Sequence, residues 1–179
     1  MLEARSALGR DIRIERTGLV LEEAAGFTLT QLAGSGAALK KALGKVPGKV
    51  GTAQDHDGFV VFRTGTKQVW VLGEAPQAAE GLFVTPLSSS RTRIALSGAR
   101  ARDVLAASAA IDFHETQFKP GHFVMTGIHH TPVLIHCIGA DAFHIYAMRT
   151  FALAVWEWLN DAAEGLSPAP SAGASPSAA

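Results

Sequence analysis

The feature that most constrains the fold of this chain is a match of the sequence with itself, which predicts an internal duplication. Pro120 follows Pro47 by 73 residues, and the same offset places residues 133–135 (VLI) on residues 60–62 (VVF) without a gap. The chain is therefore interpreted as two halves with related folds.

A strand that ends in glycine opens the matching part of each half, at Gly34 in the first and at Gly98 in the second. These two glycines are 64 residues apart, which is shorter than the offset farther along the chain. We therefore expect an insertion around residues 106–116. The two halves then span about residues 13–84 and 85–164.

Each half has the pattern of a strand, a helix and two strands, where a short apolar run with alternation indicates a strand and a longer periodic one a helix. The expected elements are 28–34, 37–43, 58–63 and 67–72 in the first half, and 93–98, 99–108, 132–138 and 142–148 in the second. A helix over 150–163 closes the second half, and a weaker helical stretch over 76–80 closes the first. This order predicts an α+β protein with two ferredoxin-like (split βαβ) halves, each an antiparallel sheet with helices on one face.

The composition indicates one folded domain and a protein partner. Residues 165–179 contain only Gly, Leu, Ser, Pro and Ala, which is typical of a disordered tail, so the domain is expected over residues 1–164. The hydrophobic fraction of 47% suits a buried core, whereas the charged fraction of 18% is small for a fully solvated surface. Sixteen basic residues balance sixteen acidic ones without a basic run, so no nucleic-acid ligand is expected.

The single cysteine, Cys137, excludes an internal disulfide and a site with several cysteine ligands, which fits a reducing compartment. The first residues carry charges throughout, and nowhere do eighteen apolar residues run together. We therefore expect a cytoplasmic protein that neither carries a signal peptide nor spans a membrane.

Six of the seven histidines lie within residues 114–144, which raises the alternative of a metal or proton-transfer site. At the offset of 73, however, His136 falls on Arg63, a position that is already polar, so these side chains are expected to face solvent. His129 and His130 are adjacent, and on an extended strand they would point to opposite faces. We therefore predict no metal site on this chain.

Other patterns that could carry chemistry have simpler interpretations. Cys137 follows His136 on a strand, where neighbours project to opposite faces, so the cysteine is expected to be a small buried side chain. Gly34 and Gly36 frame a strand-to-helix turn, but Leu39 stands where a dinucleotide-binding motif requires glycine. The carboxylates have no evident partner. The sequence therefore predicts no catalytic, cofactor-binding or metal-binding residue on this chain.

Several segments of the second half resemble a known family, the gamma subunit of heterotetrameric sarcosine oxidase and its relatives in methylamine-oxidising flavoenzymes. The resemblance covers about residues 85–163. Its residues are Arg93-Ile94-Ala95-Leu96-Ser97-Gly98, Arg102-Asp103-Val104-Leu105, Ile111-Asp112-Phe113-His114, Phe118, Pro120-Gly121, Arg149-Thr150-Phe151-Ala152 and Trp156-Glu157-Trp158-Leu159. Thr150 departs from the pattern, because serine is common there in the family.

The resemblance implies a fold similar to the folate-binding aminomethyltransferase of the glycine cleavage system, in which ferredoxin-like halves pair. It implies a non-catalytic small (gamma) subunit in a heterotetramer with alpha, beta and delta subunits, whose FAD, FMN, NAD, zinc and tetrahydrofolate lie on those partners. Such a complex serves sarcosine catabolism: it oxidises an N-methyl amino acid and passes the methyl carbon to folate or releases formaldehyde. Two alternatives stay open, namely a stand-alone folate-binding aminomethyltransferase-like protein and a small adaptor unrelated to amine oxidation. Against the first, the chain is short and shows no counterpart of the transferase's catalytic aspartate region.

The last helix is the candidate partner interface, with Arg149, Phe151, Trp156 and Trp158 as its residues. The apolar residues of this helix follow two neighbouring rows and so form a wide face. Because the two tryptophans are two positions apart, they point in different directions, and one can anchor in the core while the other reaches a partner. The alternative is that both tryptophans are buried within the chain.

Overall fold

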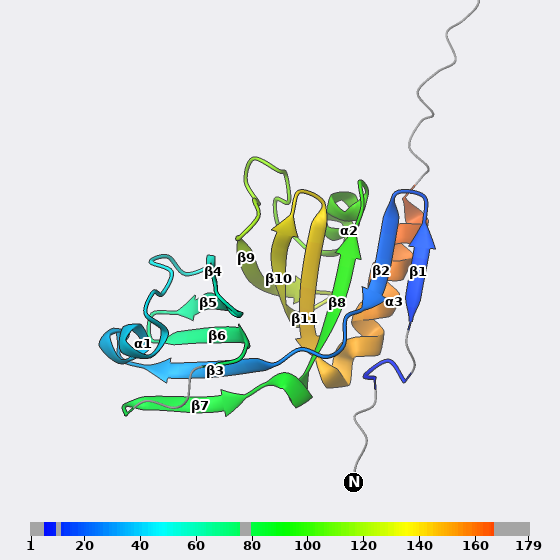
Figure 1. The fold of residues 1–179 in the computed structure, drawn as a ribbon. Helices are drawn as coiled ribbons and strands as arrows, with labels where there is room; N and C mark the ends of the chain where they lie inside the picture. The colour runs from blue at the N-terminus through cyan, green and yellow to red at the C-terminus, as the bar shows by residue number, and fades with distance from the viewer. Residues whose placement is uncertain (1–5, 10–11, 76–79, 167–179) are drawn as a thin grey trace, which may run out of the picture.

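Two antiparallel sheets form most of the computed structural model, which describes residues 6–9, 12–75 and 80–166 (Figure 1). Sheet A has the strand order β1 (Arg13–Arg16), β2 (Leu19–Glu23), β8 (Arg91–Ser97), β11 (Ala142–Met148), β10 (Thr131–Gly139) and β9 (Phe123–Ile128). Sheet B has the order β4 (Ala53–His56), β5 (Phe59–Gly65), β6 (Gln68–Gly73), β3 (Leu29–Gly34) and β7 (Leu82–Pro86). The strands of sheet B run across those of sheet A in the view of Figure 1.

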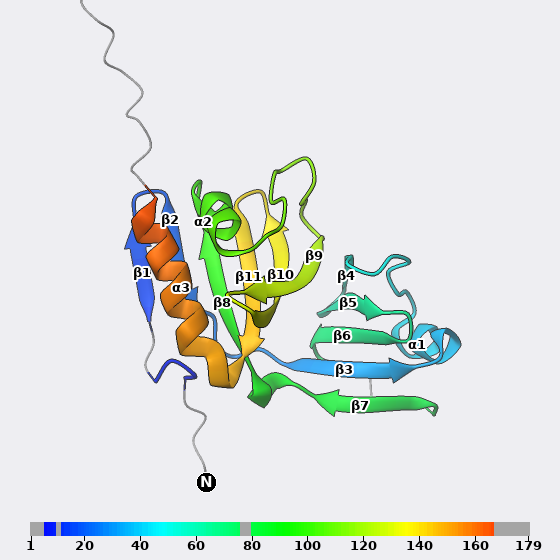
Figure 2. The same ribbon diagram turned by 180° about the vertical axis from the view of Figure 1, so that it is seen from behind.

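Helices cover the outer faces of the two sheets. Helices α2 (Ala101–Ser108) and α3 (Ala152–Gly165) pack side by side on the face of sheet A that points away from sheet B (Figure 2). Helix α1 (Gly36–Leu43) follows β3 and packs on the outer side of sheet B. Two short 3-10 turns, η1 (Ser88–Ser90) and η2 (Arg149–Phe151), precede β8 and α3. The layers are therefore α2 and α3, sheet A, sheet B and α1.

Three hydrophobic clusters fill the spaces between these layers. The largest lies between sheet A and helices α2 and α3, and a second lies between sheet B and α1. The third joins the two sheets and draws on both, with Phe62 and Trp70 from sheet B and Phe123, Leu134 and Tyr146 from sheet A. This shared cluster arises because sheet A buries both of its faces, as the nearly continuous burial of β10 shows.

Close backbone approaches explain the glycine that follows or ends the first strand of each unit. A Cβ on Gly34 would lie 2.6 Å from the carbonyl oxygen of Gly81, in the turn before β7. A Cβ on Gly98 would lie 2.4 Å from the carbonyl oxygen of Gly18, in the β1–β2 turn, and Gly98 also has φ of 112°. Neither position can hold a side chain without moving its neighbour. Ser35 then caps α1 by accepting a hydrogen bond from the Ala38 N–H at 3.1 Å.

The expected order of strand, helix and two strands is present in both halves. β6 lies between β3 and β5, and β11 lies between β8 and β10, which is the arrangement of a split βαβ unit. The strand orders β4-β5-β6-β3 and β9-β10-β11-β8 correspond, as a duplication requires.

The self-match at an offset of 73 is wrong by one residue in this region. It pairs Val61, which packs on the α1 side of sheet B, with Leu134, which faces sheet B from sheet A. Side chains alternate along a strand, so an odd offset exchanges the two faces. An offset of 74 matches the two β-bulges, since Gly65 pairs with Gln68 and Gly139 pairs with Ala142.

Several elements differ from the sequence-based expectation. The strands β4 and β9 add a third strand after each helix, and β7 and the β1–β2 hairpin are additional. That hairpin lies in sheet A, so residues 13–23, which were assigned to the first half, pack with the second. The expected insertion lies in the connection 109–122 after α2, and the last helix begins with η2 and runs to Gly165. Of the weak helical stretch 76–80, residues 76–79 lie outside the described residues, as does most of the predicted tail.

Within the described residues, the longest helix falls short of the length and apolar character that crossing a membrane requires.

Candidate functional site

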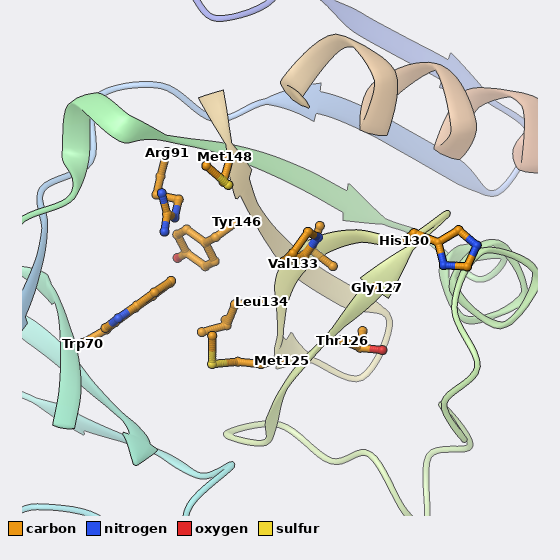
Figure 3. Close-up of a pocket in the computed structure, with 11 residues that line it drawn as sticks. Trp70, Arg91, Met125, Thr126, Gly127, His130, Val133, Leu134, Tyr146 and Met148 are labelled. Carbon is orange, nitrogen blue, oxygen red and sulfur yellow. The ribbon is translucent and has the colours of Figure 1, made fainter. Parts of the chain in front are cut away.

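A groove of about 400 Å³ opens between the two sheets, where β6 approaches β10 and β11 (Figure 3). We call it the inter-sheet groove; its lining residues are Trp70, Arg91, Met125, Thr126, Gly127, His130, Pro132, Val133, Leu134, Tyr146 and Met148. Trp70 forms one wall and is held by the hydrogen bond that its Nε1 donates to Gln31 Oε1 at 3.1 Å. The Arg91 guanidinium carbon lies 5.5 Å from the centroid of the Trp70 ring, a cation–π contact. Met125 and Met148 are exposed at the rim, and such flexible apolar side chains adapt to a bound surface.

Three polar side chains are buried behind this groove, where the sequence pattern of β10 and β11 turns them toward sheet B. His136 and His144 are directly opposite each other on the two strands, and Tyr146 is the next residue of β11 on the same face. His136 is 5% exposed and Tyr146 2%. Among the described residues, His136 Nδ1, His144 Nδ1 and the Tyr146 hydroxyl have no hydrogen-bond partner.

Burial keeps all three groups uncharged at neutral pH. It lowers the pKa of His136 to about 4, and it does the same to the pKa of His144, to which the charge of Arg93 adds. Burial raises the pKa of Tyr146 to about 12, against the opposing effect of Arg93. A catalytic base needs an acceptor nitrogen with an orienting partner, and a neutral imidazole without one lacks this arrangement. These groups can donate and accept hydrogen bonds, which suits recognition better than proton transfer.

The described part of the chain brings together no group of three or more His, Cys, Asp or Glu side chains that could hold a metal ion. His56, which also has a buried ring nitrogen without a partner there, stacks on Phe59 at 4.5 Å rather than joining His136.

Two expectations about the histidines are wrong. His136 is buried, not solvent-facing, because the offset of 73 assigned it to the wrong face of its strand. His129 and His130 do not lie on an extended strand: they form the two-residue turn between β9 and β10, with φ of 43° and 68°. Positive φ at both positions is typical of a tight hairpin turn and is uncommon for histidine.

Cys137 is confirmed as a small buried side chain. It is fully buried on the helix side of β10, opposite to His136, and its Sγ donates to the carbonyl oxygen of Gly139 at 3.1 Å. Burial raises the pKa of its thiol, so the reactive thiolate is disfavoured.

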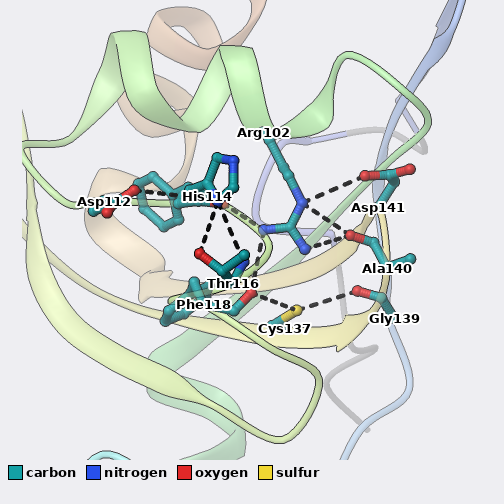
Figure 4. A network of polar contacts seen from close by, with 10 residues as sticks. Arg102, Asp112, His114, Thr116, Phe118, Cys137, Gly139, Ala140 and Asp141 are labelled. Atoms are coloured by element: carbon teal, nitrogen blue, oxygen red, sulfur yellow. Dashed lines mark hydrogen bonds and ion pairs between the residues drawn. The ribbon is translucent and has the colours of Figure 1, made fainter.

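The polar residues that carry the family resemblance after α2 hold a loop in place (Figure 4). Arg102 donates to the carbonyl oxygens of Phe113, of Phe118 at 3.2 Å and of Ala140, and it forms an ion pair with Asp141 at 3.4 Å. Its guanidinium also lies 5.1 Å from the Phe143 ring centroid. The connection 109–122 has little regular structure of its own, so Arg102 ties it to the β10–β11 turn. These motif residues support the fold.

The four predicted interface residues separate into core and surface. Trp156 is 4% exposed and belongs to the cluster beneath α2 and α3, so it is the core anchor. Trp158 is partly exposed and its ring lies 4.7 Å from that of His129. Phe151 is 44% exposed and Arg149 is exposed as well. Arg149 and Phe151 therefore share one surface at the start of α3, while Trp156 does not reach it.

Sequence reasoning missed the inter-sheet groove and its polar residues. Arg91 and Arg93 alternate with buried apolar residues on β8, as His144 and Tyr146 do on β11. That period of two was the available signal, because it places all four side chains on one face.

Comparisons with known proteins agree with the geometry. The sequence profile of the "Sarcosine oxidase, gamma subunit family" matches residues 71–165. The chain is 31% identical over 141 residues to "Sarcosine oxidase subunit gamma" from Corynebacterium sp. (strain U-96), a match that covers 76% of this chain and 69% of that protein. The fold is similar to a chain of the structure titled "Heterotetrameric Sarcosine Oxidase from Corynebacterium sp. U-96 in complex with pyrrole 2-carboxylate", with a TM-score of 0.76, 27% identity and coverage of 84% of this chain and 86% of that one. The glycine cleavage system aminomethyltransferase T from Bartonella henselae has a related fold, with a TM-score of 0.54, 17% identity and coverage of 76% of this chain and 44% of that one.

Proposed function

The chain belongs to the sarcosine oxidase gamma subunit family, and from this premise we propose that it is the small, non-catalytic subunit of a heterotetrameric sarcosine oxidase-like enzyme. The observation that carries the proposal is the structural match over most of both chains with a subunit of such a heterotetramer. The aminomethyltransferase likeness extends over less than half of that enzyme, which favours a subunit over a stand-alone transferase.

The proposed complex oxidatively demethylates an N-methyl amino acid in the cytoplasm, with the methyl carbon entering tetrahydrofolate metabolism. In this proposal FAD, FMN, NAD, zinc and tetrahydrofolate lie on the alpha, beta and delta subunits. The buried groups His136, His144 and Tyr146 support a non-catalytic role here, because none of them has an orienting partner within the described residues.

The partner interface is proposed at the start of α3. Phe151 is 44% exposed and Leu153 52%, and Met148 and Arg149 precede them along the chain. Large apolar side chains grouped next to an arginine are typical of the centre of a protein interface. Trp158, stacked on His129, lies farther along the same helix and extends the candidate surface.

The interface is tested with the double substitution Phe151→Asp and Leu153→Asp, co-expressed with the partner subunits. Both side chains are exposed, so the isolated subunit should keep its melting temperature while its affinity for the complex falls at least about tenfold. Gel filtration measures recovery of the complex, and circular dichroism measures folding. The matched control is Val50→Asp, which changes an apolar residue that is 50% exposed before sheet B. Normal assembly of the double variant would place the interface elsewhere.

We also propose that the two halves arose by duplication, with an offset of 74 residues over β5–β6 and β10–β11. The support is the corresponding strand order, the matching β-bulges at Gly65 and Gly139, and the similar backbone approach at Gly34 and Gly98.

A further inference from the structure

A second cavity, distinct from the inter-sheet groove, lies where the chain leaves β2 and crosses toward sheet B. Its volume is about 520 Å³, and arginine side chains from two elements line it: Arg91 and Arg93 from β8 and Arg149 from η2. We call it the arginine pocket. Phe27 and Ser89 contribute to its walls. Cavities of this size are typical of small-molecule sites.

The contacts of Arg93 fix its guanidinium without neutralising it. Its Nε donates to the carbonyl oxygen of Ala24 at 3.1 Å and its Nη2 to that of Ala25 at 3.4 Å. The guanidinium carbon also lies 5.1 Å from the Phe27 ring centroid. A guanidinium has five N–H groups, so donors are left over, and they are held in a defined orientation.

Arg91 is in a similar position. Its Nη1 donates to the carbonyl oxygen of Ser90 at 3.2 Å, and partial burial lowers the pKa of its side chain. Over residues 6–9, 12–75 and 80–166, no carboxylate forms an ion pair with Arg91 or Arg93. Partly buried charges are usually paired, because leaving water without a counter-charge is costly.

The one carboxylate that lines the pocket is already engaged. Glu23 accepts hydrogen bonds from the Ser6 hydroxyl and, at 3.1 Å, from the Ala7 N–H. Thr92 also lines the pocket and is 2% exposed, and its hydroxyl has no hydrogen-bond partner in the described part of the chain. The pocket thus offers guanidinium and hydroxyl donors in excess of its acceptors.

We propose that the arginine pocket binds the oxyanion group, a carboxylate or a phosphate, of a small molecule. Such a group supplies the missing negative charge, and its oxygens match the fork of N–H donors on Arg91 and Arg93. The Phe27 ring beside Arg93 provides an apolar wall for the remainder of the ligand.

The test uses the full chain with two probes, inorganic phosphate and succinate, each compared with sodium chloride at equal ionic strength. Binding is measured as the rise in melting temperature and as amide shifts in NMR spectra. One or both probes should saturate, with shifts at residues 23–27 and 88–93, and the two arms identify which oxyanion is preferred. An equal response to chloride would show charge screening only and would overturn the proposal.

Arg93→Gln should weaken binding of the probe about tenfold or more, because a charged hydrogen-bonding fork is lost. Arg91→Lys keeps the charge but removes the fork, so it should weaken binding while disturbing the fold less. The matched control is Arg63→Gln, because Arg63 also donates to two carbonyl oxygens, those of Gly65 and Thr66, outside the pocket. Unchanged affinity in both Arg91 and Arg93 variants would overturn the proposal. So would loss of probe binding in the assembled complex, since a partner's carboxylate would then be the occupant.

Discussion

At the scale of residues, His136 makes the stability of this protein depend on pH. Its pKa is lowered by burial from the ordinary value of 6.5 to about 4, so the unfolded chain binds a proton more readily than the folded one. Stability from this group is therefore complete above about pH 6.5, falls as the pH drops toward 4, and is lost by on the order of 3 kcal/mol. Urea unfolding at pH 7, 5.5 and 4.5 measures the loss. His136→Phe should flatten the profile while keeping an aromatic ring against Phe62, whose centroid is 4.8 Å away. Parallel decline of both proteins would assign the pH dependence to other groups.

At the scale of elements, β7 is an edge strand without the usual protection. It pairs only with β3, carries no charged residue and exposes 79% of Phe83. The opposite case is the edge strand β1, whose four residues include Arg13, Glu15 and Arg16. Because uncharged edges pair with other chains, the isolated subunit should self-associate as its concentration rises, and Phe83→Lys should suppress this without lowering the melting temperature. Sedimentation velocity over a concentration series measures the effect. Equal suppression by Val50→Lys, a change outside β7, would argue against the edge as the cause.

At the scale of the whole molecule, two similar units share one core, since Phe62 of sheet B packs on Phe123 and Tyr146 of sheet A. This shared core supports the proposal of a single domain. The duplication predicts that, in an experimentally determined structure, residues 59–72 superpose on 133–146 with β3 falling on β8. Inward-facing side chains should then coincide with inward-facing ones. A better superposition at an offset of 73, or a different path through either unit, would contradict the proposed relationship.

The sequence by itself determined the elements whose signals are local. Glycine-bounded apolar runs located β3, β5, β6, β8, β10 and β11, and helical periodicity located α1, α2 and α3. The motif around Arg149 and Trp156 identified the family. Short edge strands such as β4 and β9 were missed, because a few half-exposed residues acquire their structure from the neighbouring strand.

Only the tertiary structure decided which way the side chains face and which distant segments meet. A register error of one residue along a strand moves every side chain to the opposite face, and this is why His136 was expected in solvent and is found in the core. Likewise, Arg91, Arg93 and Arg149 surround one cavity because β8 and η2 meet where the connection after β2 leaves sheet A. That convergence depends on long-range strand pairing, which local sequence patterns do not encode.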